Sequence, residues 1–78
     1  QTSSDRENNS NIYHYTLALA ALKAKQAQQA LPHLQVLIRQ NAEHILYRLL
    51  QAEIQYSLGH AQEAFENYRN ILKIYPYS

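Results

Sequence analysis

The chain repeats its own pattern every 34 residues without a gap, as Ala18 and Ala52 illustrate. The aligned pairs are Ala18 with Ala52, Lys25 with Gly59, Ala30 with Ala64, Leu31 with Phe65, Leu34 with Tyr68, Leu37 with Ile71 and Ile38 with Leu72. Self-similarity at this period, in a chain with helical patterning, is the signature of a helical repeat array. The repeat therefore predicts the architecture and argues against most enzyme folds.

Length and composition narrow the class further. A chain of 78 residues forms one small domain with a limited core. Seven Lys and Arg against six Asp and Glu give no electrostatic footprint for nucleic acid or an anionic membrane. One Gly and two Pro do not suit a turn-rich β fold, and the absence of Cys excludes disulfides. No apolar run reaches the roughly 18 residues of a membrane span, so we expect no membrane insertion.

Two segments follow from the polarity of the chain. Residues 1–10 lack apolar periodicity and are predicted to be a polar linker or a frayed N-terminus, whereas residues 11–78 form the repeat domain. Ser4 with Glu7 could form a capping box and start a helix earlier, but we favour a start near Ser10 or Asn11. Because the chain begins with Gln1 and not Met, we expect it to be a fragment of a larger protein or a processed product.

Four helices are predicted from apolar spacings of three and four, over residues 11–25, 28–40, 43–58 and 61–74. Pro32 is expected in the first turn of its helix, where a missing amide hydrogen does little harm. Gly59 is expected to end the third helix with positive φ, and Pro76 to end the fourth. The residues of the fourth helix expected to face inward are Ala64, Phe65, Tyr68, Ile71 and Leu72.

The second half of the chain resembles a tetratricopeptide repeat (TPR). The small residue, turn glycine, alanine, aromatic and closing proline of that family stand at Ala52, Gly59, Ala64, Tyr68 and Pro76. The first repeat keeps Leu17, Ala18, Ala30 and Leu34. It departs from the family at Lys25 and Ala42, where Gly and Pro are usual. The aromatic residue early in the first helix is absent from both repeats, where His14 and Arg48 stand in its place. The resemblance implies an all-α fold of two stacked helix-turn-helix hairpins with four antiparallel helices, and a protein or peptide as partner.

The sequential order Tyr15, Ala18 and Ala20, followed by the second repeat, carries a narrower resemblance. It is similar to the C-terminal TPR tails of bacterial envelope zinc metallopeptidases. It implies an alternative function, a substrate-docking or regulatory tail, and a bacterial envelope or periplasmic location. The HExxH motif of such enzymes is absent from this chain. We therefore expect any peptidase chemistry to lie outside it.

The first helix of each hairpin lines the concave groove in the TPR family. The residues that this resemblance assigns to a partner-binding groove are Ile12, Tyr15, Leu19, Leu22, Leu46, Leu49, Glu53 and Tyr56. Some TPR domains hold chaperone C-termini with a clamp of Lys, Arg and Asn in this groove. Here Tyr15, Leu19, Leu46 and Leu50 stand near those places, so an apolar peptide or helix is the expected ligand.

Catalytic and metal-binding patterns are weak. No two of the four histidines have the i, i+4 spacing of a helical zinc site, and His60 with Glu63 is only an i, i+3 pair. No nucleophile elbow or phosphate loop occurs. We predict no enzyme activity, catalytic residue, metal site or cofactor.

Self-association is a third possibility beside the interaction module and the docking tail. Two repeats leave two open ends, whereas about three repeats are usually needed to cover a solenoid core. We expect Phe65, Ile74 and Tyr75 to remain exposed on the last helix. The isolated chain is therefore expected to form a homo-oligomer.

Overall fold

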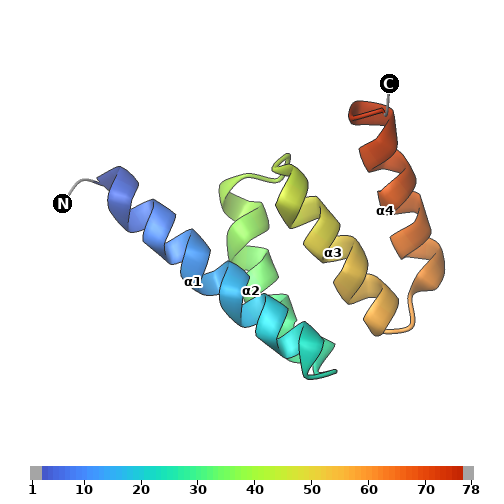
Figure 1. The fold of residues 1–78 in the computed structure, drawn as a ribbon, viewed down its shortest axis with the longest axis horizontal. Coiled ribbons are helices and arrows are strands. Elements are labelled where there is room, and N and C mark those ends of the chain that lie inside the picture. The colour runs from blue at the N-terminus through green and yellow to red at the C-terminus, as the bar shows by residue number, and fades with distance from the viewer. Residues whose placement is uncertain (1–2, 77–78) are drawn as a thin grey trace.

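The computed structural model describes residues 3–76, with side chains from Asn9 onward, and this part consists of four helices without a strand (Figure 1). The helices are α1 (Ser3–Lys23), α2 (Ala27–Gln40), α3 (Ile45–Ser57) and α4 (Ala61–Ile74). α1 packs with α2 and α3 packs with α4, so that each pair forms a hairpin, and α2 and α3 join the two hairpins. The predicted all-α fold with two hairpins is confirmed.

Four alanines at repeat-equivalent positions are completely or almost completely buried, namely Ala18, Ala30, Ala52 and Ala64. Each lies on a different helix. A methyl side chain lets helix axes approach to the short end of the usual 8–10 Å or so, because nothing larger separates the backbones. The repeated alanines therefore set the spacing within both hairpins.

The largest fully buried side chains lie on the two middle helices. Leu37 comes from α2, and Leu50 and Ile54 come from α3. Leu31 and Ile38 of α2 are partly buried against this core. The interior of the molecule therefore lies where the two hairpins meet.

α4 makes its described contacts with α3 alone and has no helix on its other side (Figure 1). Ala64 and Ile71 are buried and Tyr68 is partly buried, as predicted. The inward placement of Phe65 and Leu72 is wrong, because these side chains are 56% and 61% exposed. Their equivalents in α2, Leu31 and Ile38, have a following hairpin to pack against, and α4 does not.

Both hairpins turn through the same hydrogen-bonded motif. In the first, the amide of Gln26 donates to the carbonyl of Ala21 (2.8 Å) and that of Lys25 to Leu22 (3.0 Å). In the second, the donors are His60 and Gly59 and the acceptors are Gln55 and Tyr56, at 2.8 and 3.0 Å. This pair of bonds defines a Schellman motif, which needs a left-handed residue after the helix.

That left-handed residue is Gly59 in the second turn, with φ of 89°, and Lys25 in the first, with φ of 62°. The predicted positive φ of Gly59 is confirmed. Lys25 takes the same conformation although its β-carbon makes it unfavourable. Lysine in place of glycine at this repeat position therefore leaves the turn geometry unchanged.

The start of the first helix was predicted too late. α1 begins at Ser3, whereas residues 1–10 were expected to be a linker or frayed end, with the helix starting near Ser10 or Asn11. The capping box of Ser4 with Glu7 lies outside the described side chains. α2 also begins one residue early, at Ala27, so Pro32 lies in the second turn and has no amide to donate to the carbonyl of Gln28. The helix continues through this position to Gln40.

The two turn residues allow a paired stability test. Lys25→Gly should stabilise the fold by about 0.5–1 kcal/mol, because glycine adopts positive φ without a steric penalty. Gly59→Ala should destabilise it by about 1 kcal/mol, because alanine is unfavourable at positive φ. The added β-carbon would meet no atom within 4 Å, so a steric clash adds nothing to this conformational cost. Urea unfolding followed by circular dichroism measures both changes.

Lys25→Ala is the control for this pair, because it removes the lysine charge but keeps a β-carbon. Its stability should stay near that of the wild type. A Lys25→Gly variant no more stable than Lys25→Ala would show that the turn carries no conformational penalty.

The buried alanine of α4 gives a packing test. Ala64→Leu should lower the free energy of unfolding by about 1–3 kcal/mol, because three extra carbons must fit where α3 and α4 approach each other. Ala61→Leu, at an exposed position in the first turn of the same helix, is the matched control and should change stability by far less. Equal urea midpoints for the two variants would contradict this assignment.

Candidate functional site

An apolar pocket of about 180 Å³ lies between α1 and the start of α3. Its lining residues, which define the α1–α3 pocket, are Asn11, Ile12, Tyr15, Thr16, His44, Leu46 and Tyr47. None of them is Lys, Arg, Asp or Glu. The pocket therefore suits an apolar group better than a charged one.

Two exposed aliphatic side chains flank the α1–α3 pocket. Ile12 on α1 is 57% exposed and Leu46 on α3 is 47% exposed. They occupy equivalent positions of the two repeats. Each hairpin thus contributes a largely exposed aliphatic side chain from the same place on its first helix. Neither side chain belongs to the buried core of the chain.

Aromatic rings form the wall of the pocket. The rings of His44 and Tyr47 stack with centroids 4.2 Å apart and an interplanar angle of 17°. Tyr15 on α1 lies 6.1 Å from Tyr47, centroid to centroid. These contacts join α1 to α3 beside the opening and hold the ring of Tyr47, which is almost completely buried.

His44 also begins α3. Its Nδ1 accepts a hydrogen bond from the amide of Leu46 at 3.2 Å, which caps one of the free amides of the first turn. This bond requires Nδ1 to be unprotonated in that contact. The cap fixes the ring that stacks on Tyr47 and so positions the wall of the α1–α3 pocket.

Asn11 contributes an unused acceptor. Among the described side chains, its Oδ1 is buried without a hydrogen-bond partner. A buried carbonyl oxygen without a donor is unfavourable by about 1–3 kcal/mol.

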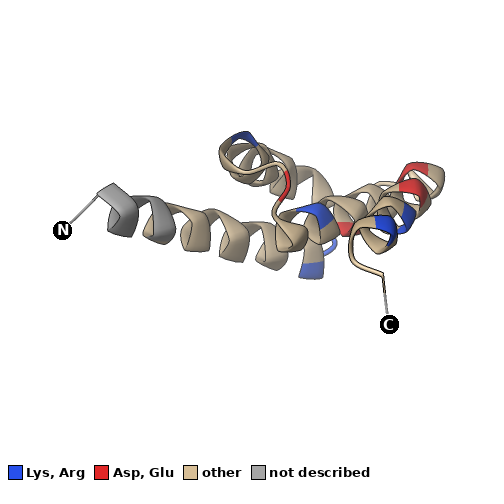
Figure 2. Cartoon of the chain, turned by 90° about the horizontal axis from the view of Figure 1, so that it is seen from above, with Lys and Arg blue, Asp and Glu red and all other residues tan. Residues whose placement is uncertain are grey.

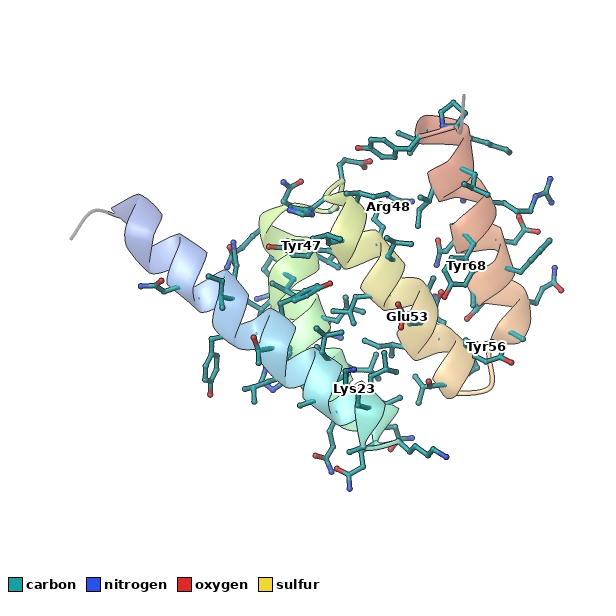
Figure 3. All side chains as sticks on the ribbon, viewed as in Figure 1. Lys23, Tyr47, Arg48, Glu53, Tyr56 and Tyr68 are labelled. Atoms are coloured by element: carbon teal, nitrogen blue, oxygen red, sulfur yellow. The ribbon has the colours of Figure 1, made fainter. Side chains whose placement is uncertain are left out.

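The eight residues predicted for the groove separate into three groups. Ile12, Tyr15 and Leu46 line the α1–α3 pocket. Leu19 and Leu22 are partly buried against the core, and Leu49 is partly buried on α3. Glu53 and Tyr56 are exposed further along α3, and Figure 3 shows Tyr47 and Tyr56 at opposite ends of that helix.

Four pocket residues were not predicted from the sequence, namely Asn11, Thr16, His44 and Tyr47. Asn11 and Thr16 are polar and carry no periodic signal. His44 stands at the junction between the link and the third predicted helix, and histidine is not among the preferred N-cap residues, so its capping role had no sequence signal. Tyr47 is the repeat equivalent of Tyr13, and this pairing was the one available clue.

Polar contacts fasten α4 to α3 away from the pocket. Asn67 Nδ2 donates to Gln55 Oε1 at 2.6 Å. Tyr68 projects from α4 toward α3 (Figure 3). Burial, and to a smaller extent the negative charge of Glu53, raise the pKa of the Tyr68 hydroxyl above its ordinary value. The neutral phenol is therefore the form that suits this interface.

The charges of the described residues are mixed in sign. Figure 2 shows Lys and Arg interspersed with Asp and Glu, and Lys23 is the charged residue in the described side chains of α1. The ion pairs are Arg48 with Glu43, Arg69 with Glu66 and His60 with Glu63, the last requiring a protonated imidazole. No face carries a basic stripe in this part of the chain.

The described residues contain no group of three or more His, Cys, Asp or Glu side chains placed to hold a metal ion. They also contain no helix of sufficient length and apolar character to cross a bilayer. The residues predicted for self-association, Phe65, Ile74 and Tyr75, are all exposed on α4 or directly after it.

No protein-family model, curated protein or solved structure matches this chain.

Proposed function

We propose that the chain is a protein-interaction module of the TPR type that binds an apolar peptide or helix in the α1–α3 pocket. The observation that carries this proposal is the pair of exposed aliphatic residues, Ile12 and Leu46, at the edge of an uncharged opening. Exposed apolar surface bounded by polar residues is typical of interaction sites.

The size and lining of the pocket support a peptide as the ligand. A volume of about 180 Å³ leaves room for an apolar anchor side chain, and Tyr15 and Tyr47 offer rigid aromatic contact. The backbone amides of a peptide would also supply the donor that Asn11 Oδ1 lacks. Helix-in-groove recognition uses anchors of this kind at spacings of three and four residues.

A peptide selection tests the proposal. Peptides of random sequence are displayed and selected on the wild-type chain, and the affinities of the winners are measured by fluorescence anisotropy. Selected peptides should carry a large apolar residue, and Leu46→Asp should weaken their binding at least tenfold by placing a charge at the edge of the pocket.

Leu72→Asp is the matched control, because Leu72 is at least as exposed as Leu46 but lies on α4. It should leave peptide affinity unchanged. Selected peptides whose binding responds equally to both substitutions, or not to Leu46→Asp, would argue against the α1–α3 pocket as the site.

We further propose that the open face of α4 associates with a second copy of this chain. Phe65 and Leu72 repeat the positions of Leu31 and Ile38, which α2 partly buries against the core. The same face on α4 has no covering helix among the described residues. Ile74 and Tyr75 extend this apolar surface and are also about half exposed.

Sedimentation equilibrium tests the association. The wild-type chain should populate dimers or larger species as its concentration rises. The double variant Phe65→Glu, Leu72→Glu should shift the equilibrium to monomer, because it places two negative charges on the apolar face of α4. Leu46→Asp serves here as the control and should associate as the wild type does. A wild-type chain that stays monomeric at high concentration would refute this second proposal.

A further inference from the structure

Two histidines that are distant in sequence face each other across α1 and α2. Nδ1 of His14 lies 2.9 Å from Nδ1 of His33, and the ring centroids are 5.1 Å apart. The ring of Tyr13 stands nearly perpendicular to both, at 5.2 Å from His14 and 6.3 Å from His33. Neither histidine lines the α1–α3 pocket.

We propose that His14 and His33 form a chelating site for a divalent transition-metal ion, with Cu²⁺ or Ni²⁺ as the ions that fit it best. The neutral imidazole nitrogen is a common ligand of Cu²⁺, Ni²⁺ and Zn²⁺. Here two such nitrogens lie within hydrogen-bond distance of each other, so that a small rotation of the two rings would let an ion beside them join α1 to α2 through two bonds.

The separation of the two nitrogens distinguishes among these metals. With metal–nitrogen bonds of about 2.0–2.1 Å, two nitrogens 2.9 Å apart subtend an angle of about 90° at the metal. That angle belongs to neighbouring ligands of a square-planar or octahedral ion. A tetrahedral zinc site would need the nitrogens about 3.3 Å apart at the same bond length. The present separation is closer to the square-planar or octahedral value, and Cu²⁺ binds most tightly within the divalent series, so Cu²⁺ is the ion that we expect the pair to prefer.

Water would complete the coordination. The described residues offer no third His, Cys, Asp or Glu beside the pair. Both histidines are only partly buried, and an open hollow lined by Leu17, Gln29 and other residues reaches His33. A site with two protein ligands leaves further positions open to solvent.

Ligation also requires a proton to move. In the present contact, one Nδ1 donates and the other accepts a hydrogen bond. A metal needs the lone pair of both, so the donor ring must lose its Nδ1 proton to solvent and take one at Nε2. A neutral pair thus binds the ion without net proton release, whereas a protonated ring releases one proton per ion.

The second hairpin lacks such a pair. The repeat equivalents of His14 and His33 are Arg48 and Asn67, and these side chains bind elsewhere, to Glu43 and Gln55. The proposed site is therefore particular to the first hairpin and is not a consequence of the repeat. It is also independent of the peptide-binding proposal, because it shares no residue with the α1–α3 pocket.

Titration of the 78-residue chain with CuCl₂ in a non-coordinating buffer tests the site. We expect one Cu²⁺ per chain, with nitrogen hyperfine structure from two imidazoles in the electron paramagnetic resonance spectrum. His14→Ala and His33→Ala should each weaken binding at least tenfold and remove one nitrogen from the spectrum. His60→Gln is the control and should bind as the wild type does. Ni²⁺ should bind more tightly than Zn²⁺.

A measurement on the wild-type chain tests the site even if one of the histidine variants fails to fold. At substoichiometric Cu²⁺, the ring resonances of His14 and His33 should broaden in the NMR spectrum before those of His44 and His60. A first effect at His44 or His60, a spectrum with one nitrogen ligand, or unchanged affinity in folded His14→Ala would overturn the proposal.

Discussion

The close approach of helices at four buried alanines is the constraint on which the rest of the structure depends. Ala18 and Ala30 lie in the first hairpin and Ala52 and Ala64 in the second, and all four have lost their solvent contact. In a chain of 78 residues the core is small, so little apolar area is available to compensate for a gap between helices. The alanines bring the helices close enough for Leu37, Leu50 and Ile54 to fill the centre. The α1–α3 pocket follows from the same packing, because it opens where the first helices of the two hairpins converge.

The turns show how this packing overrides local preference. Gly59 suits a left-handed conformation, and Lys25 does not, yet both have positive φ and both close the same two hydrogen bonds. Antiparallel helices held at a fixed spacing leave few ways to connect them. The first hairpin therefore keeps its turn at a conformational penalty on Lys25.

Periodicity predicted what depends on neighbouring turns of one helix. The four helices and the positive φ of Gly59 follow from apolar spacing and from glycine chemistry, and the ends of α2, α3 and α4 lie within two residues of the prediction. The start of α1 at Ser3 did not follow, because polar residues carry no periodic signal. Phe65 and Leu72 were wrongly placed inward, because the spacing of apolar residues shows which side of a helix is apolar but not whether another helix covers that side.

The candidate sites were harder to predict because they depend on contacts between helices. Ile12, Tyr15 and Leu46 were found through the repeat, but His44 enters the pocket by capping α3 and stacking on Tyr47. The pairing of His14 with His33 joins residues 19 positions apart on different helices, and no spacing rule for a single helix detects it. Comparing the repeats separates these cases. Equivalent residues that are buried in both hairpins, such as Ala18 and Ala52, maintain the fold. Equivalent residues that are exposed in both, such as Ile12 and Leu46, lie outside the core, and the proposed binding surface rests on them. Where the hairpins differ, as at His14 and Arg48, the chemistry belongs to one hairpin alone, and a metal bound there would fasten α1 to α2 without altering the second hairpin.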